Sequence, residues 1–309
     1  MVGTVRYNPM LENLQLLFDY PFLGGDLIAN GLMIGAIFAL AAFGMALVWG
    51  VLGIINIAQG ELVMLGGFVA ITAAELGVPA LATIPVAAVV LLLIGWGLYR
   101  IVIFRVVDRD LFVSLLATFG LSIVLQQLSN EVFGADVQTL ETGLGTLFLF
   151  DGQIVLPEIK LVACGTAMVV GIVLWAFLKR ARLGQAIRAT SQNARAARIL
   201  GIDTDRVYAA TFALNAALCG AAGSLVAMAW TVHPYIGLPY TVRSFLVVVV
   251  AGIGNIAAVI FAGLGLGAVE NLAGFILGSE YQIAFVFVLM VVILVVRNLL
   301  LRRKRDYLK

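Results

Sequence analysis

The 309-residue chain is 62% hydrophobic and 12% charged, with a mean hydropathy of +1.09; soluble domains hold about 45–50% apolar and about 25% charged residues, so a soluble protein is excluded. The chain has one histidine, His233, so a Ser-His hydrolase or a zinc protease is disfavoured because both need histidines in their active sites. The two cysteines lie in predicted spans, where neither a disulfide nor a zinc site is expected. The net charge is +2, but sixteen of the nineteen Lys and Arg residues fall within 100–109, 179–206 and 297–309, which indicates membrane topology signals and disfavours nucleic-acid binding.

Residues 1–26 precede the first long apolar run and are predicted to form an interfacial segment. They contain acids and a proline but no basic stretch leading into an apolar core, so no cleavable signal peptide is predicted. The first span would then direct its own insertion. Within this segment, LENLQLLF at 11–18 fits a short amphipathic helix lying on the membrane surface.

Residues 27–298 are predicted to form the membrane domain. A hydrocarbon core of about 30 Å needs about 20 apolar residues per helix. Runs of that size lie near 27–49, 54–76, 81–103, 112–133, 159–178, 207–231, 243–260, 261–278 and 281–298. The expected fold is an all-α polytopic membrane protein with about eight or nine transmembrane helices. Gly-rich turns near 50–53 and 252–258 are candidates for broken helices, and they leave the count open.

The three basic clusters set the predicted orientation, because short loops rich in Lys and Arg stay in the cytoplasm. The amino terminus is then external, and residues 299–309 form a basic cytoplasmic tail. The 134–158 loop, which carries Asp136, Glu141, Asp151 and Glu158 but no cation, falls outside.

Two of the Gly-rich turns resemble each other. Residues 53–58 and 252–257 match at five of six positions, and internal repeats with interrupted helices point to the transport route in membrane transporters. Chance similarity in a Gly-, Ile- and Ala-rich chain is the alternative. Small-xxx-small pairs predict close helix packing; they are Gly31/Gly35, Gly263/Gly267 and Gly274/Gly278.

Ionisable residues within a bilayer are costly, so they usually face a cavity or each other. Five polar residues in apolar surroundings are therefore predicted to line or brace a substrate pathway: Asn56, Gln59, Glu61, Glu270 and Asn271. Helical spacing would put Asn56 and Gln59 on one face. Hydrogen bonding between helices, without substrate contact, is the alternative. No paired Arg and carboxylate is obvious for an amino acid zwitterion, and Arg243 is expected to extend toward the membrane surface.

The longest polar stretch, 179–206, is predicted to be a cytoplasmic coupling loop. Leu183 to Leu200 fits one short helix, and Gly201 is well placed to end it. Small side chains would let this helix enter a groove of a partner, while arginines bind its carboxylates. A solvated basic loop near anionic lipid is the alternative. The predicted coupling residues are Arg182, Gly184, Arg188, Arg195, Arg198, Leu200 and Gly201.

Several of these segments together resemble a known family. Residues 53–61 are similar to a G-x-I-N-x-A-[HQ]-G-E pattern, 200–207 to L-G-I-[ND]-T-D-R-V, and 234–237 and 251–254 to further landmarks. The pattern is that of the permeases of branched-chain amino acid ABC importers, LivH type, over about residues 27–298. One departure is that Asn255-Ile256-Ala257-Ala258 stands where the family commonly has small-x-Pro-Gly.

The resemblance implies an inner-membrane, multi-pass transport subunit that is not itself an enzyme. Its implied partners are a homologous second permease subunit, two cytoplasmic ATPase subunits, an external solute-binding protein and the lipid bilayer. No G-x-x-x-x-G-K-[ST] occurs in the chain, so no cofactor is expected on it, and ATP-Mg would be used by the partner subunits. Related permeases carry branched-chain amino acids, urea, short amides or organic acids, so each of these is a candidate solute. The alternative class of protein is a secondary transporter that works without partner subunits.

Overall fold

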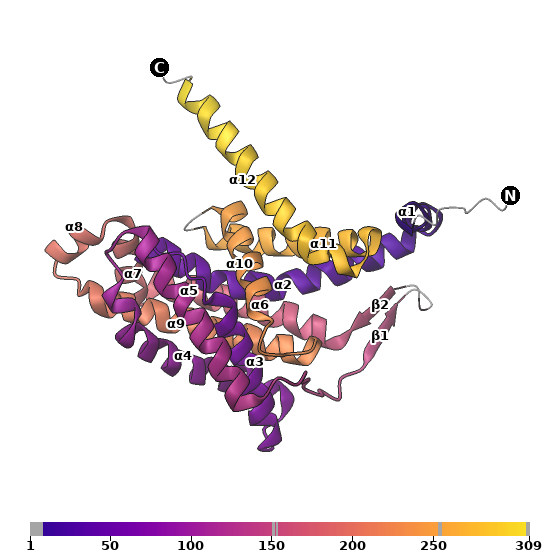
Figure 1. The fold of residues 1–309 in the computed structure, drawn as a ribbon, viewed down its shortest axis with the longest axis horizontal. Coiled ribbons are helices and arrows are strands. Elements are labelled where there is room, and N and C mark those ends of the chain that lie inside the picture. Colours follow the sequence, from indigo (N-terminus) through magenta and orange to yellow (C-terminus); the bar gives the residue numbers. More distant parts are fainter. Residues whose placement is uncertain (1–8, 150–151, 153, 253–254, 307–309) are drawn as a thin grey trace.

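The computed structural model describes residues 9–149, 152, 154–252 and 255–306, and most of these residues are helical (Figure 1). The helices are α1 (Pro9–Asp19), α2 (Pro21–Leu52), α3 (Gln59–Glu75), α4 (Thr83–Ile101), α5 (Leu111–Phe133), α6 (Glu158–Arg180), α7 (Arg182–Gln192), α8 (Ala194–Ile199), α9 (Thr204–Ala229), α10 (Gly237–Ala251), α11 (Ile256–Leu277) and α12 (Gln282–Asp306). Short 3-10 turns lie at Ala80–Ala82, Ile103–Arg105 and Ser279–Tyr281, and two strands, β1 (Thr146–Leu149) and β2 (Ile154–Pro157), form one antiparallel hairpin.

The helices confirm the predicted all-α polytopic membrane fold. Among the described residues, seven helices are long and apolar enough to cross a bilayer: α2, α4, α5, α6, α9, α11 and α12. The predicted spans near 54–76 and 243–260 correspond to shorter helices, α3 of 17 residues and α10 of 15 residues. Together they agree with a prediction of eight or nine membrane helices. The amphipathic segment 11–18 is also helical, within α1.

The predicted limits of the seventh and eighth spans are wrong. α10 begins at Gly237 and ends at Ala251, and α11 begins at Ile256, because two local signals divide the apolar run. Gly252 has a φ of 82°, which favours glycine and ends α10. Asn255 Oδ1 accepts a hydrogen bond from Ala258 N at 3.2 Å and caps α11. Gly53, with a φ of 69°, ends α2 in the same way, so both predicted Gly interruptions are helix ends; residues 253–254 lie outside the described chain.

The hairpin in the 134–158 loop was not predicted. Asp26 Oδ1 accepts a hydrogen bond from Val155 N at 2.8 Å, and Asn30 Nδ2 donates to Val155 O at 3.0 Å. Lys160 Nζ donates to Asn30 Oδ1 at 2.8 Å. These bonds hold β2 to α2 and α6, at the end of the molecule away from α7 and α8 (Figure 1).

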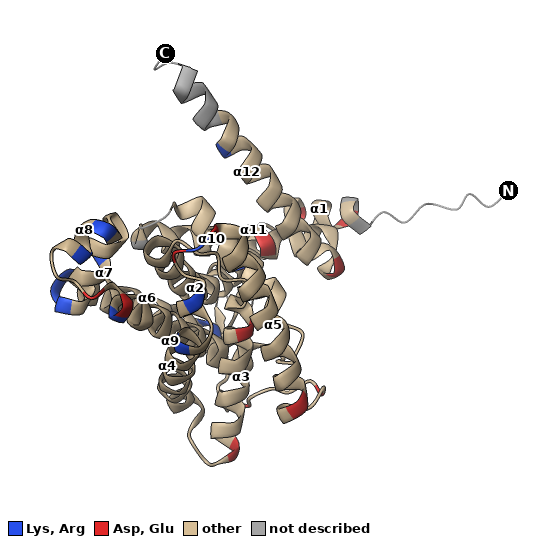
Figure 2. Ribbon diagram, turned by 60° about the vertical axis from the view of Figure 1, so that its left-hand side comes forward, with Lys and Arg blue, Asp and Glu red and all other residues tan. Residues whose placement is uncertain are grey.

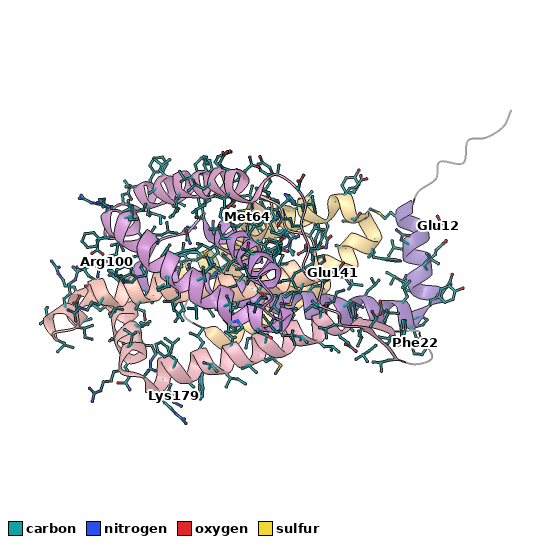
Figure 3. The ribbon with its side chains drawn as sticks, turned by 90° about the horizontal axis from the view of Figure 1, so that it is seen from below. Glu12, Phe22, Met64, Arg100, Glu141 and Lys179 are labelled. Carbon is teal, nitrogen blue, oxygen red and sulfur yellow. The ribbon has the colours of Figure 1, made fainter. Side chains whose placement is uncertain are left out.

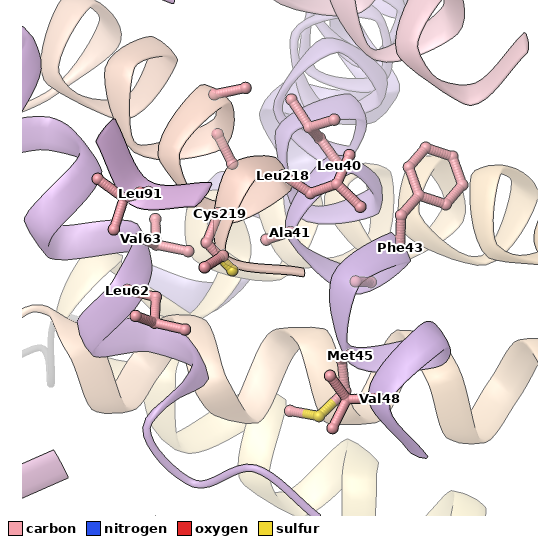
Figure 4. Packing of buried hydrophobic residues seen from close by; sticks show 14 of the residues in the cluster. Leu40, Ala41, Phe43, Met45, Val48, Leu62, Val63, Leu91, Leu218 and Cys219 are labelled. Atoms are coloured by element: carbon pink, nitrogen blue, oxygen red, sulfur yellow. The ribbon is translucent and has the colours of Figure 1, made fainter. Parts of the chain in front are cut away.

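The core is built around α2 and α9. In the most apolar window of each helix 89% of the residues are buried, against 6% for α12. Side chains of α2, α3, α4 and α9 pack together there, among them Met45, Leu62, Leu91 and Leu218 (Figure 4). The outer helices present apolar surface outward, and α12 extends away from the others (Figure 1), as expected of helices that face lipid or another membrane subunit.

Close packing of α2 against α11 confirms the prediction for two small-xxx-small pairs. A Cβ on Gly35 would lie 2.3 Å from Gly263 O, and one on Gly31 would lie 2.6 Å from Ala268 Cα. A Cβ on Gly267 would lie 2.3 Å from Gly31 O. The two backbones therefore touch at a stripe of residues without side chains, in the manner of small-residue contacts between membrane helices.

The basic loops gather at one end of the molecule. Arg198 Nη2 lies 2.9 Å from Asp108 Oδ2, which joins the 100–109 and 179–206 stretches. Figure 2 shows the concentration of Lys and Arg on α7 and α8, and Figure 3 shows Arg100 and Lys179 at the opposite end from Glu12 and Phe22. We call these the basic end and the hairpin end.

Candidate functional site

The segment between α2 and α3, residues 53–58, is irregular backbone buried among helices. Thr118 Oγ1 of α5 donates to Ile55 O at 3.2 Å, and Thr241 Oγ1 of α10 donates to Ile57 O at 2.9 Å. Non-helical backbone at membrane depth is tolerated only where protein or a water-filled cavity satisfies it. Residues from two helices, α5 and α10, therefore support a break that a simple transmembrane helix would not contain.

Asn56 and Gln59 meet, but the prediction that both lie on one helix is wrong. Asn56 precedes α3, and its Nδ2 donates to Gln59 Oε1 at 3.2 Å. Gln59 Nε2 in turn donates to Ala41 O at 2.9 Å and to Cys219 Sγ at 3.1 Å. Both amides are fully buried, and within the described chain Asn56 Oδ1 has no hydrogen-bond partner.

Glu61 lies where the amino termini of α3 and α10 touch. Gly60 N donates to Thr241 Oγ1 at 2.8 Å, and a Cβ on Gly237 would lie 2.3 Å from the carboxyl carbon of Glu61. The Glu61 residue is 4% exposed. Its Oε2 atom finds no donor among the described residues. Glycine at 60 allows the two helix ends to approach this closely, because a Cβ there would lie 1.7 Å from Gly237 O.

Arg243 and Glu270 form a buried ion pair that corrects two sequence predictions. Arg243 Nε lies 3.0 Å from each Glu270 oxygen, and the side chains are 12% and 2% exposed. The Arg243 guanidinium also lies over the rings of Phe38 and Tyr240, 5.1 Å and 5.6 Å from their centroids. Arg243 therefore does not extend to the membrane surface, and the chain does contain an Arg–carboxylate pair. The two residues lie on different helices, α10 and α11, so no local sequence pattern indicates that they pair.

The predicted pathway residues divide into two groups and one outlier. Asn56, Gln59 and Glu61 cluster at the start of α3, while Glu270 lies with Arg243. The first turns of α10 contact both groups through Gly237, Thr241 and Arg243. Asn271 belongs to neither, because its Nδ2 donates to Leu27 O at 2.7 Å in the α2–α11 contact. Within the described residues, no three His, Cys, Asp or Glu are placed to hold a metal ion.

At the basic end, the predicted single helix from 183 to 200 is two helices. Asn193, with extended backbone, ends α7, and its Oδ1 accepts a hydrogen bond from Ala196 N at 3.0 Å to cap α8. An Asn that caps a new helix competes with continuing the old one. Gly184 packs α7 against the end of α6, since a Cβ there would lie 2.2 Å from Phe177 O.

The exposed surface of α7 and α8 is basic with an apolar tip. Arg182, Arg188, Arg195 and Gly201 are exposed. Ile199 and Leu200 are each 81% exposed; Ile199 was not among the predicted coupling residues, although its place beside Leu200 could have suggested it.

Arg198 differs from the other arginines, because it is engaged within the chain. Besides its pair with Asp108, its Nε donates to Thr204 Oγ1 at 2.6 Å. The hydrogen bond to Asp108 raises the pKa of the Arg198 guanidinium above its usual value. Arg198 therefore holds α8 to the start of α9 and to the 100–109 stretch, and is less free than Arg195 to bind another protein.

Comparison with known proteins gives one consistent family. The family model described as branched-chain amino acid transport system / permease component matches residues 27–294. The high-affinity branched-chain amino acid transport system permease protein LivH of Escherichia coli K12 is 31% identical over 287 residues, covering 86% of this chain and 91% of that protein. LivH of Salmonella typhimurium is 33% identical with the same coverage, and BraD of Pseudomonas aeruginosa is 29% identical over 284 residues, 87% of this chain and 92% of BraD. No solved structure gives a significant match.

Proposed function

The chain belongs to the branched-chain amino acid transport permease family, and from that membership we propose that it is the membrane-spanning subunit of an ATP-driven importer of branched-chain amino acids or related small polar solutes. Its multiple apolar helices fit this role. The proposed partners are a homologous second permease subunit, two cytoplasmic ATPases that use ATP-Mg, and an external solute-binding protein. The proposed location is the inner membrane.

The observation that carries the coupling proposal is the apolar tip at the basic end. Leaving Ile199 and Leu200 in water is unfavourable, and an exposed apolar patch rimmed by charges is typical of a protein interaction site. Arg195 beside it can bind carboxylates of an ATPase. We propose that α8 and the end of α7 bind in a groove of one ATPase subunit, so that the movement of this ATPase on binding ATP is passed into the membrane helices.

Close contacts link the apolar tip at Ile199 and Leu200 to the membrane helices, so that a movement of the tip can be transmitted to them. Arg198 joins α8 to α9 and to the stretch after α4, and Gly184 joins α7 to α6. α9 in turn packs against α3, where a Cβ on Gly66 would lie 2.6 Å from Gly220 Cα. A displacement of α8 would therefore reach the α3–α10 junction at Glu61, which we propose as part of the solute route.

Two alternatives remain open to test. An importer of the same type could carry urea, amides or organic acids, and a cognate binding protein selective for one of these would favour it. The chain could also act alone as a secondary transporter. The unpartnered Glu61 carboxylate favours this second reading, because such carriers use acids that titrate.

A coupling experiment separates these readings. Leu200→Asp should abolish ATP-dependent uptake of radiolabelled L-leucine in cells that carry the whole importer, and it should weaken copurification of the ATPases. Glu75→Gln, an exposed change on α3, is the control and should behave as wild type. Uptake that persists without ATP would refute the importer assignment, and normal uptake by Leu200→Asp together with Arg195→Glu would refute the coupling surface.

A further inference from the structure

In the described part of the chain two acids, Glu61 and Glu270, are buried among the helices, and one of them is paired with a cation. Glu270 receives three hydrogen bonds from Arg243. Glu61 has no Lys, Arg or His within ion-pair distance among the described residues, and its Oε2 has no donor. A buried carboxylate without a partner is unusual and is typical of a functional group whose partner comes and goes.

The carboxyl group of Glu61 lies between two helix amino termini. Glu61 lies in the first turn of α3, and its carboxylate touches Gly237, the first residue of α10. Helix amino termini present unpaired N–H groups and partial positive charge, which stabilise a nearby anion. Two such ends meet at this one carboxyl group, and its buried Oε2 atom has no donor among the described residues.

The free polar atoms beside α3 are acceptors. Asn56 Oδ1, on the irregular segment that leads into α3, lacks a donor just as Glu61 Oε2 does. A primary ammonium group carries three N–H donors and one positive charge, which matches a buried carboxylate without a donor. A solute with only a carboxylate would bring no donor and would repel an ionised Glu61, and a neutral amide would bring N–H donors but no positive charge.

We propose that Glu61 receives the ammonium group of the solute as it passes between the amino termini of α3 and α10. The solutes carried are then those with a free primary ammonium, and organic acids without one are rejected at this point. This inference rests on the proposed importer function. In the present conformation the contact is closed, because a Cβ on Gly60 would lie 1.7 Å from Gly237 O; the solute enters when the two helix ends separate.

The first test uses the whole importer in proteoliposomes with its binding protein. Glu61→Gln keeps the shape and removes the charge, and it should lower the maximal rate of L-leucine uptake at least tenfold. ATP hydrolysis stimulated by the loaded binding protein should continue. Glu61→Asp should recover part of the rate, and Glu75→Gln, on the same helix but exposed, should leave it unchanged.

The outcomes distinguish a failure of this proposal from a failure of the proposed importer function. Absence of ATP-dependent L-leucine uptake by the wild type overturns the proposed substrate, and this inference with it. Wild-type uptake with an equal rate in Glu61→Gln overturns this inference alone.

The second test needs no variant and so is independent of folding. A carbodiimide that modifies carboxyl groups is applied to the wild-type importer, and the peptide holding Glu61 is quantified by mass spectrometry. L-leucine and L-leucinamide, which both carry the ammonium, should protect Glu61, whereas 4-methylpentanoate, which lacks it, should not. Equal protection by 4-methylpentanoate, or no protection by L-leucinamide, would show that Glu61 does not receive the ammonium.

Discussion

The α2–α11 contact gives the sharpest prediction about stability, through the substitution Gly35→Ala. The added methyl group would lie 2.3 Å from Gly263 O and 2.7 Å from Leu264 Cα. Both neighbours are backbone atoms in helices, so neither can move by a side-chain rotation. Ordinary contact begins near 3.4 Å, and the helices must therefore separate by about 1 Å.

The cost follows from two effects of that separation. Overpacking of a well-packed interior costs about 1–3 kcal/mol. A gap of about 1 Å also loses a quarter to a half of the dispersion energy along the Gly31–Gly267 contact. We expect Gly35→Ala to lower the free energy of unfolding by about 2–3 kcal/mol, beyond the small gain that alanine brings to helix propensity.

The assay is thermal unfolding of the purified protein in detergent, with Gly97→Ala as the matched control. Gly97 lies in α4, and a Cβ there would have no heavy atom within 4 Å. The control should be neutral or up to about 1 kcal/mol more stable, because alanine favours a helix. If Gly35→Ala unfolds at the wild-type temperature, or if both variants lose stability equally, the helices do not touch in the way described.

Three further predictions concern polar contacts. Glu270→Gln or Arg243→Gln alone should each lower the free energy of unfolding by about 3–5 kcal/mol, because each leaves a buried charge unpaired; the double variant should lose less than the sum, and additive losses in the thermal cycle would argue against the pair. Asp108→Arg and Arg198→Asp should each reduce L-leucine uptake while changing stability by less than about 1 kcal/mol, as expected for a half-exposed pair; the double reversal should restore uptake, and a double variant no better than either single would refute the contact. Asn193→Ala should cost about 1 kcal/mol through loss of the α8 cap; faster proteolysis between α7 and α8 would report it, and unchanged protection would contradict it.

Sequence patterns predicted well those features that depend on local composition. The apolar runs gave the membrane helices, and the Gly-rich turns at Gly53 and Gly252 were recognised as interruptions, because each effect acts within a few residues, although the predicted span 243–260 ran through Gly252. The polar residues at 56, 59 and 61 stood out for the same reason. The break at Asn193 was missed, since an Asn within a helical pattern can either continue the helix or cap a new one.

What the sequence by itself determined, then, is that this chain dissolves in a bilayer, which apolar runs form its membrane helices, and which family it resembles. Only the tertiary structure decided that Arg243 meets Glu270, that the carboxylate of Glu61 touches Gly237, and that Arg198 is held by Asp108. The physical reason is that composition fixes the free energy of placing one helix in lipid. The choice of partner for a buried charge instead depends on which helices lie side by side, and residues 27, 90 or 176 positions apart along the chain give no local sign of that.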